Sequence, residues 1–145
     1  MGAGIDGPLG MDQTTFLMTG GHGLYGPPSD YIKFQRALLR GGELDGTPIL
    51  RQATVDEAFR NQIGDLDFQA GPGYKWGYGL LLNTADIPGM RRAWSGAWAG
   101  LCNTQFWIDR TTGVCGSIYS NFLPFVTPEA VTMYNDFERA LYASL

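Results

Sequence analysis

The segment that begins at Trp94 constrains the fold of this chain more than any other. Two Trp-x-Gly triplets, which begin at Trp94 and Trp98, run into an alternating segment that ends at Asp109, and a short turn leads from there to another apolar segment. Alternating side chains joined by a short connection are typical of antiparallel neighbours in a sheet. We therefore expect strands over residues 101–108 and 114–119.

Two further strands are expected upstream of this segment. Period-two spacing of aromatic residues begins at Tyr74 and leads into the leucines at 80–82, which predicts the first strand of the sheet. The dipeptide Pro88-Gly89 indicates a turn, and another strand is expected after it over residues 91–97. Short connections again favour antiparallel pairing.

Helices are expected before and after these strands in the sequence. Ser29 fits the N-cap of a first helix, which Gly41-Gly42 would end. A shorter helix is expected over residues 53–61, and Thr127 followed by Pro128 predicts the start of a last helix that lies across the sheet. The expected apolar faces of the three helices are, in order, Tyr31, Phe34, Leu38 and Leu39; Val55, Ala58 and Phe59; and Tyr134, Phe137 and Leu141.

The order of these elements predicts an α+β fold, an antiparallel β-sheet with packed helices. Residues 1–19 are expected to be a loose N-terminal lead-in, because the first ten residues contain four glycines and a proline. Residues 20–145 then form the α+β domain. A chain of 145 residues, of which 44% are apolar, is expected to bury one hydrophobic core.

Charge and cysteine usage limit the classes of partner. The formal net charge is -4 and no Lys/Arg cluster is present, which argues against nucleic acid and anionic membranes as partners. No apolar run is long enough to span a bilayer, and the order of a signal peptide is missing, so a soluble cytoplasmic protein is predicted. Cys102 and Cys115 would lie roughly 17 Å apart in the expected hairpin. That separation is too large for a disulfide, so both thiols are expected to be reduced.

Several short sequence motifs, taken in their order along the chain, resemble those of a known family. They are Pro8-Leu9-Gly10-Met11, Gly20-Gly21-His22-Gly23-Leu24-Tyr25, Ser29-Asp30-Tyr31, the segment 38–46, Trp76-Gly77-Tyr78-Gly79-Leu80, the segment 98–109 and Leu123-Pro124-Phe125. Together they resemble the β-lactamase-related serine hydrolases, and among these the carboxylesterases that are similar to class C β-lactamases. The resemblance implies the C-terminal part of a β-lactamase/transpeptidase-like fold over residues 20–145.

Three motifs carry the chemistry in that family, and the first of them is absent from this chain. A serine hydroxyl becomes a nucleophile when a base such as a lysine one helical turn away takes its proton, which is the logic of Ser-x-x-Lys. The only lysines are Lys33 and Lys75, and Asp30 and Pro72 stand three residues before them. Tyr119-Ser120-Asn121 spells the second motif, but it follows the third motif instead of preceding it, so we expect a coincidence at a strand end.

The third motif is expected at Trp98-Ala99-Gly100, since the distance from Gly100 to Trp107 matches the family pattern; Trp94-Ser95-Gly96 is the competing register. The resemblance implies that the backbone N–H of Leu101 belongs to an oxyanion hole, where a fixed donor stabilises the tetrahedral intermediate. Ser95 and His22 are weaker catalytic candidates. The residues expected to bind substrate are Trp94, Trp98 and Tyr25.

No cofactor is expected, and no metal site, because the pair Asp65 and Asp67 lacks further ligands at a fixed spacing. Two hypotheses follow. The chain is the C-terminal half of a serine hydrolase that acts on small carboxylic esters or amides once an N-terminal segment completes it, and it is inactive alone. Alternatively, it is a non-catalytic binding module or truncated relic that keeps an aromatic cleft. An uncompleted sheet would expose an edge, which favours a homodimer.

Overall fold

The computed structural model describes residues 26–66 and 70–145. The chain divides into two units, Met1–Tyr31 and Ile32–Leu145. The fold that positions the candidate site belongs to the second unit. The lead-in predicted over residues 1–19 lies outside the described residues, so the predicted division at residue 20 stays a prediction.

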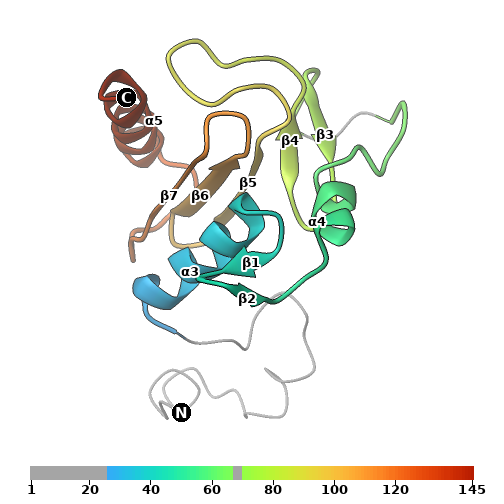
Figure 1. The fold of residues 1–145 in the computed structure, drawn as a ribbon. Coiled ribbons are helices and arrows are strands. Elements are labelled where there is room, and N and C mark those ends of the chain that lie inside the picture. Colours follow the sequence, from blue (N-terminus) through green and yellow to red (C-terminus); the bar gives the residue numbers. More distant parts are fainter. Residues whose placement is uncertain (1–25, 67–69) are drawn as a thin grey trace, which may run out of the picture. The chain divides into compact units, whose positions relative to one another are not determined.

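Five antiparallel strands form the main sheet, in the order β3-β4-β5-β6-β7 (Figure 1). A two-stranded sheet, β1-β2, accompanies it. This architecture confirms the predicted α+β class. The elements, in chain order, are α3 (Pro28–Leu39), β1 (Glu43–Leu44), β2 (Thr47–Pro48), α4 (Gln52–Ala58), β3 (Tyr74–Trp76), β4 (Leu81–Asn83), β5 (Gly96–Gly100), β6 (Thr104–Asp109), β7 (Val114–Ile118) and α5 (Pro128–Ala143).

Helix α3 ends where the sequence predicts, at the glycine pair. The N–H of Gly42 donates to the carbonyl of Ala37 over 2.8 Å, and the N–H of Gly41 donates to the carbonyl of Leu38 over 3.2 Å, which is the pattern of a Schellman motif. Three details were wrong. Tyr31, expected on the apolar face, is 39% exposed. Ser29 lies inside the helix, because proline at position 28 already has the backbone angle of a first turn. Phe34 was expected to be buried and is 45% exposed.

Helix α4 is shorter than predicted but buries the expected side. Val55 and Phe59 are 0% and 7% exposed, and Phe59 follows the last helical residue. Arg51 occupies the N-cap and makes no side-chain capping hydrogen bond. The short length is consistent with a helix held by tertiary packing, because helices of this size are marginal on their own.

The segment that starts at Tyr74 is a hairpin, whereas one continuous strand was expected. Strands β3 and β4 pair from Tyr74 opposite Asn83 to Trp76 opposite Leu81. The chain reverses through Gly77 and Gly79, and the latter has a positive φ of 72°. A Cβ atom at Gly77 would overlap the carbonyl oxygen of Ala58 in α4. Glycine therefore permits both the reversal and the close approach to the helix.

Strands β5 and β6 are also displaced from the predicted positions. The expected strand over residues 91–97 is a loop as far as Ser95, and β5 spans Gly96–Gly100. Strand β6 begins at Thr104, three residues later than expected, because residues 101–103 form a turn. Strand β7 is confirmed over Val114–Ile118. Cys115 lies opposite Ile108 while Cys102 lies in the turn, and both thiols are free.

Helix α5 begins as predicted. The Thr127 hydroxyl accepts a hydrogen bond from the N–H of Ala130 over 3.3 Å, and proline follows the cap. The expected apolar stripe is confirmed at Tyr134, which is 6% exposed, whereas Phe137 is 43% exposed and Leu141 is partly buried. Glu138, on the same helix, is fully buried, and no local pattern predicted this.

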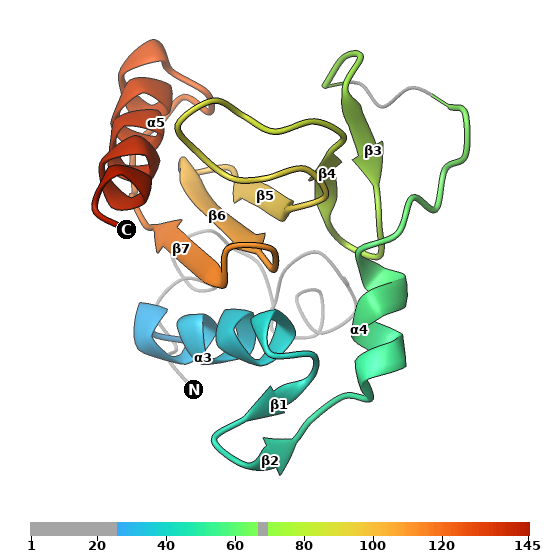
Figure 2. The same cartoon turned by 45° about the horizontal axis from the view of Figure 1, so that its top comes forward.

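Helices cover opposite faces of the sheet, and in Figure 2 β6 and β7 lie between α5 and α3. On the α3 and α4 side, the core contains Leu38, Val55, Phe59, Leu80, Leu82 and Ile108. On the other side, the ring of Trp107 makes edge-to-face contacts with Tyr134 and Phe137, each with a centroid distance of 5.8 Å. Neighbouring residues of β6 thus serve different faces, as the pleat requires. Within the described part of the chain, no helix is long and apolar enough to cross a membrane.

The close approach at Gly42 generates a prediction about stability. Gly42 and Gly46 both have positive φ values, 106° and 83°, but only at Gly42 would a Cβ atom overlap a backbone atom, the carbonyl oxygen of Leu50. We expect Gly46→Ala to lower the free energy of unfolding by about 1–2 kcal/mol, the cost of a left-handed residue. Gly42→Ala should cost clearly more. Urea unfolding of both variants measures the difference, and equal losses would contradict the steric explanation.

Candidate functional site

Strand β5 carries the predicted third motif and extends past its neighbour β4. Strand β4 pairs with β5 only at Gly96 and Ala97, whereas β6 pairs with β5 as far as Gly100. The last three residues of β5 therefore pair with β6 on one side and have no β4 partner on the other. They are Trp98, Ala99 and Gly100. A Cβ atom at Gly100 would overlap the Thr104 hydroxyl across the turn, so any larger residue there requires the Thr104 side chain to move.

Leu101 was expected to begin a strand, and this prediction was wrong. It lies in the turn between β5 and β6 and is 71% exposed. The alternating pattern continues through the turn in sequence, which explains why the spacing alone placed a strand there. The oxyanion role suggested for the N–H of Leu101 stays a prediction.

Asn103 holds this turn in place. It is 1% exposed, has a positive φ of 58°, and its side-chain amide donates to the carbonyls of Phe122 (2.8 Å) and Pro124 (2.9 Å). Its Oδ1 accepts from the N–H of Val126 over 2.7 Å. Asparagine tolerates the left-handed backbone conformation of this turn better than most residues. Its side chain also forms hydrogen bonds with the backbone of the segment that leads into α5.

Tyr119-Ser120-Asn121 has a structural role through its serine. The Ser120 hydroxyl donates to the carbonyl of Cys102 in the β5–β6 turn. The triplet comes directly after β7, in agreement with the expected strand end. Its serine therefore helps to fix the turn that follows β5.

The competing triplet, Trp94-Ser95-Gly96, lies at the start of β5 and in the loop before it. Trp94 has a positive φ of 64°, and its N–H donates to the carbonyl of Asn83 over 2.6 Å. Ser95 is 1% exposed and its hydroxyl donates to the carbonyl of Arg92 over 2.7 Å. Gly96 pairs with both β4 and β6 and packs against Leu80. The Ser95 hydroxyl thus contacts a backbone carbonyl, which cannot act as a base.

A buried ion pair fixes the loop over residues 84–95 to helix α5. The Arg91 guanidinium donates to both carboxylate oxygens of Glu138, over 2.9 and 2.7 Å, and to the Tyr134 hydroxyl over 2.8 Å. Glu138 is fully buried and the Arg91 side chain is 10% exposed. Such bidentate pairs are geometrically specific. In Figures 1 and 2 this loop reaches from β4 to α5.

Asp109 joins three parts of the fold around its buried carboxylate. One oxygen accepts from the N–H of Arg92 (2.9 Å) and the hydroxyl of Tyr142 (2.8 Å), and the other accepts from the N–H groups of Thr111 (2.9 Å) and Thr112 (3.1 Å). Burial acts to raise the pKa of Asp109, but the hydrogen bonds from Arg92 and Thr112 outweigh it, so the pKa is lowered. The carboxylate therefore stays ionised.

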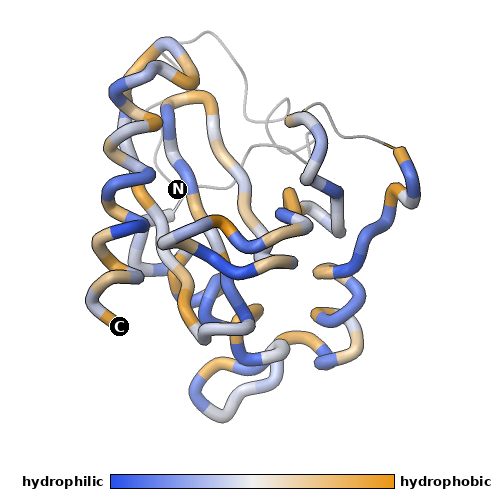
Figure 3. Tube along the Cα trace, turned by 90° about the horizontal axis from the view of Figure 1, so that it is seen from above, coloured by the Kyte–Doolittle hydropathy of each residue, from blue (hydrophilic) through white to orange (hydrophobic). Residues whose placement is uncertain are grey.

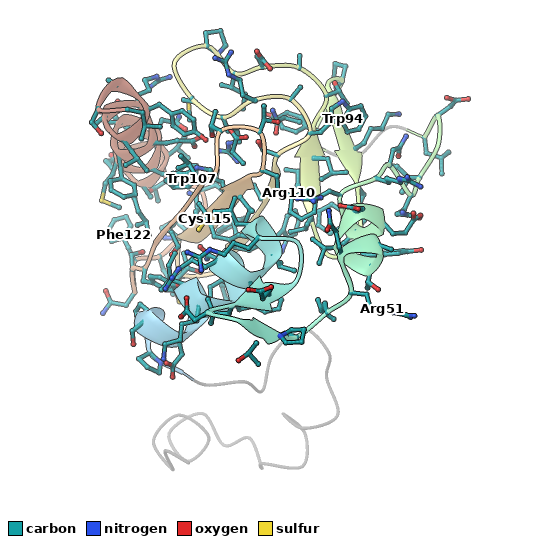
Figure 4. All side chains as sticks on the ribbon, in the orientation of Figure 1. Arg51, Trp94, Trp107, Arg110, Cys115 and Phe122 are labelled. Carbon is teal, nitrogen blue, oxygen red and sulfur yellow. The ribbon has the colours of Figure 1, made fainter. Side chains whose placement is uncertain are left out.

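The aromatic residues divide between the core and the surface. Trp107 is fully buried beneath α5, whereas Trp94, Trp98 and Tyr78 are 47%, 44% and 61% exposed. The rings of Trp76 and Trp98 meet edge to face, with a centroid distance of 4.6 Å. Figure 4 shows Trp94 near β4 and Trp107 beside α5. His22 and Tyr25, the other predicted site residues, lie outside the described residues.

A cleft of about 850 Å³ lies on the α5 side of the sheet. Trp98 and Ala99 of the predicted motif line it, together with Ala97. The described residues contain no group of three or more His, Cys, Asp or Glu side chains that could hold a metal ion.

Sequence reasoning missed the polar anchors of this site. Position 91 was considered only as the start of an expected strand, and Glu138 was not singled out at all. Their burial depends on contacts between residues 47 positions apart, which no local pattern reveals. Asn103 did carry a usable signal, because an asparagine shortly after a glycine is typical of a turn.

The chain is similar in sequence or structure to several known proteins. No family profile matches the chain. The lovastatin esterase of Penicillium rubens is 32% identical over an alignment of 116 residues, and the match covers 67% of this chain and 28% of the esterase. A mutant of simvastatin synthase (LovD6) from Aspergillus terreus matches with a TM-score of 0.77 and 25% identity, over 86% of this chain and 35% of that protein. The unliganded selenomethionyl simvastatin synthase gives 0.77 and 26%, over 86% and 36%.

A bacterial protein shows the same fold. A penicillin-binding protein homologue from Caulobacter crescentus matches with a TM-score of 0.60 and 26% identity, over 77% of this chain and 30% of that protein. The chain thus spans about a third of the length of the proteins that it matches.

The Asp109 network predicts an acid-dependent loss of stability. A group whose pKa is lowered by folding stabilises the protein above its unfolded pKa, about 3.9, and loses that effect as the pH falls through its folded pKa. We expect Asp109→Asn to lower the free energy of unfolding by roughly 2–3 kcal/mol at pH 7, because charge-assisted bonds are lost. Urea titrations from pH 7 to pH 2 should show the difference from wild type shrinking. A difference independent of pH would contradict this account, and the exposed Asp136→Asn serves as control.

The Arg91–Glu138 pair predicts that replacing one partner lowers the free energy of unfolding more than replacing both. Glu138→Ala leaves a buried guanidinium without its partner, and we expect a loss of roughly 3–5 kcal/mol in the free energy of unfolding. Arg91→Met combined with Glu138→Leu should cost less than the single change. Asp136→Ala, which removes the exposed pair with Arg139 on the same helix, should cost below about 1 kcal/mol. Thermal and urea unfolding compare the variants, and an equal cost for the single and double changes would refute the prediction.

Proposed function

This chain is related to the β-lactamase-like serine hydrolases over part of their length, and from that premise we propose that it forms the oxyanion side of a serine esterase. The curated relative is named for the hydrolysis of an ester, which supports small carboxylic esters as the substrate class. Related amides are a second substrate of the same acyl-transfer chemistry. A polypeptide that this chain does not contain would supply the nucleophile and its base.

The position of β5 carries the proposal. An oxyanion hole needs a backbone donor that a substrate carbonyl can approach, and a strand flanked on both sides cannot offer one. Gly96 has strand neighbours on both sides, whereas Gly100 lies beyond the last pair with β4. This difference favours Trp98-Ala99-Gly100 over Trp94-Ser95-Gly96 as the third motif. The donor is then the N–H of Leu101, in a turn that Asn103 holds from the opposite side.

The sequence supports the view that the isolated chain is inactive. Neither of its lysines follows a serine by three residues, and the one buried serine of the triplets, Ser95, uses its hydroxyl on a backbone carbonyl. Serine becomes reactive through an adjacent base. The activity therefore depends on completion by a segment that contains Ser-x-x-Lys.

A binding module without catalysis is the second candidate, and the exposed aromatic residues favour it. Trp98, Trp94 and Tyr78 each leave more than two-fifths of their surface accessible, which is unusual for large aromatic side chains. Aromatic faces of this kind bind apolar or carbohydrate ligands. Of these three residues, Trp98 lines the cleft on the α5 side of the sheet. This candidate requires no completing segment.

The remaining proposals concern location and self-association. We infer a cytoplasmic location, because Cys102 and Cys115 are free thiols. Homodimers are proposed to form through an edge of the sheet, where β7 is the longer of the two edge strands. A monomeric mass in light scattering at high protein concentration would count against the dimer.

A fluorophosphonate probe tests whether the isolated chain is inactive. We expect the intact mass of the purified chain to stay unchanged after incubation, because neither lysine follows a serine by three residues. A single adduct that disappears in Ser95→Ala would show that the chain is an enzyme in its own right, and it would overturn the proposal. The control is a serine hydrolase of known reactivity treated in parallel.

Co-expression with a completing polypeptide tests whether β5 contributes to ester hydrolysis. The chain would be co-expressed with the part of the Penicillium rubens lovastatin esterase that lies outside the 116 matched residues, and turnover of a nitrophenyl ester would be measured. We expect turnover only when both pieces are present. Trp98→Ala should reduce turnover about tenfold or more, on the order of 1.4 kcal/mol of transition-state stabilisation, whereas Trp94→Ala should have a smaller effect. The reverse order would assign the motif to Trp94-Ser95-Gly96.

A further inference from the structure

The two sides of strand β5 are restrained differently at its end. On one side, β6 pairs with β5 as far as Gly100, and Trp107 of β6 packs edge to face against Tyr134 of α5. Figure 3 shows hydrophobic and hydrophilic residues alternating along α5, the helix that ends at the C-terminus, as expected for a helix with one face on a sheet. On the other side, the last residue of β5 that pairs with β4 is Ala97. A restraint on Trp98 from this second side has to come from an element other than β4.

An aromatic contact provides that restraint. The ring of Trp76, the last residue of β3, meets the ring of Trp98 edge to face, with a centroid distance of 4.6 Å and an interplanar angle of 77°. Strand β3 lies beyond β4 in the sheet, so the contact joins β5 to a strand with which it does not pair. Aromatic pairs prefer this geometry because the positive edge of one ring faces the negative face of the other. The contact therefore restrains the orientation of the Trp98 ring as well as its position.

Trp76 is itself held by the end of helix α4 and the segment that follows it. The carbonyl of Trp76 accepts a hydrogen bond from the N–H of Gln62 over 2.8 Å, and the N–H of Tyr78 donates to the carbonyl of Ala58 over 3.0 Å. The side-chain amide of Gln62 donates to the carbonyl and the carboxylate of Glu57, over 2.9 and 3.1 Å. The backbone before and after position 77 is thus joined to α4.

The residue that follows Trp76 leaves the backbone no room to move toward α4. A Cβ atom at Gly77 would overlap the carbonyl oxygen of Ala58 and lie 3.3 Å from that of Arg60. The N–H of Gly77 donates to the carbonyl of Leu80 over 2.8 Å, which closes the turn into β4. In Figure 2, α4 lies at the end of β3 where this contact occurs. The Trp76 ring therefore contacts Trp98 from a rigid support.

We propose that Trp76 is a positioning residue for the candidate oxyanion motif and that it acts by holding the ring of Trp98. The inference rests on the proposed function, because it takes Trp98-Ala99-Gly100 as the third motif. A donor that stabilises an oxyanion must be fixed before the substrate arrives. Pairing with β4 would fix this part of β5 by occupying its backbone groups. A ring contact fixes the strand end through a side chain and leaves the backbone accessible to a substrate carbonyl.

Amide hydrogen exchange of the isolated, isotope-labelled chain tests the restraint without any activity. Trp76→Leu removes the ring and keeps an apolar side chain. We expect exchange over residues 98–106 to become about two- to tenfold faster, the size expected for the loss of one aromatic pair, while exchange over β7 stays unchanged. Trp76→Phe, which keeps a ring, should restore most of the protection. The matched control is Tyr78→Leu, the same kind of change at a residue that is 61% exposed.

Two results of this measurement would overturn the proposal. Unchanged exchange over residues 98–106 would show that the ring contact restrains nothing. A uniform increase over all strands would show that Trp76 contributes to global stability only. If Trp76→Leu fails to fold, Gln62→Ala replaces it, because that change removes both hydrogen bonds to Glu57 and keeps the two rings. A smaller increase over the same residues is then expected, and its absence would reject the proposal.

Catalysis gives a second readout, in the complex with the part of the Penicillium rubens lovastatin esterase outside the 116 matched residues. Trp76→Leu should lower kcat for a nitrophenyl ester about threefold or more and leave KM within about twofold, because a misplaced donor affects the transition state more than substrate binding. Trp76→Phe should recover most of kcat. On a Trp98→Ala background, Trp76→Leu should have no further effect, because its partner is already absent. Additive losses would contradict the proposal.

The outcomes separate this inference from the proposed function. A localised increase in exchange, together with a complex that hydrolyses no ester, contradicts the esterase and leaves Trp76 as the residue that fixes the end of β5. An active complex whose kcat is unaffected by Trp76→Leu contradicts the positioning role alone.

Discussion

The carboxylate of Asp109 is the interaction on which much of the remaining structure depends. It ends β6, and its four hydrogen bonds reach the loop before β5, the turn before β7 and the last turns of α5. A buried carboxylate with four donors is stable only in its ionised form. Three segments far apart in sequence are thereby fixed around one side chain.

The candidate site is positioned by polar anchors on both sides of β5. Arg91 and Glu138 hold the loop that leads into the strand, and Asn103 holds the turn that leaves it. The strand between them carries Trp98-Ala99-Gly100 past the end of β4. A rigid strand with fixed entry and exit is what a preorganised backbone donor requires. Of these anchors, Arg91 also lines the cleft on the α5 side of the sheet.

Local signals predicted the elements that depend on neighbouring residues. The Thr127-Pro128 cap, the Gly41-Gly42 stop and the β6–β7 hairpin are confirmed, because each results from backbone preferences within a few residues. The hairpin at Gly77 and Gly79 was missed, since aromatic alternation continues across it in sequence. Whether the chain reverses there depends on the approach of Gly77 to Ala58, a contact that the pattern of β3 does not contain.

The α+β class, the family and the absence of Ser-x-x-Lys could be read from the amino-acid sequence, because motif order and hydrophobic period are properties of the chain. That Trp98-Ala99-Gly100, and not Trp94-Ser95-Gly96, extends beyond a neighbouring strand became visible in the folded chain, since strand pairing joins residues that are distant in sequence. The burial of Glu138 was decided in the same way. A glutamate on a helix is normally solvated, and it is buried here because Arg91, 47 residues away, compensates its charge.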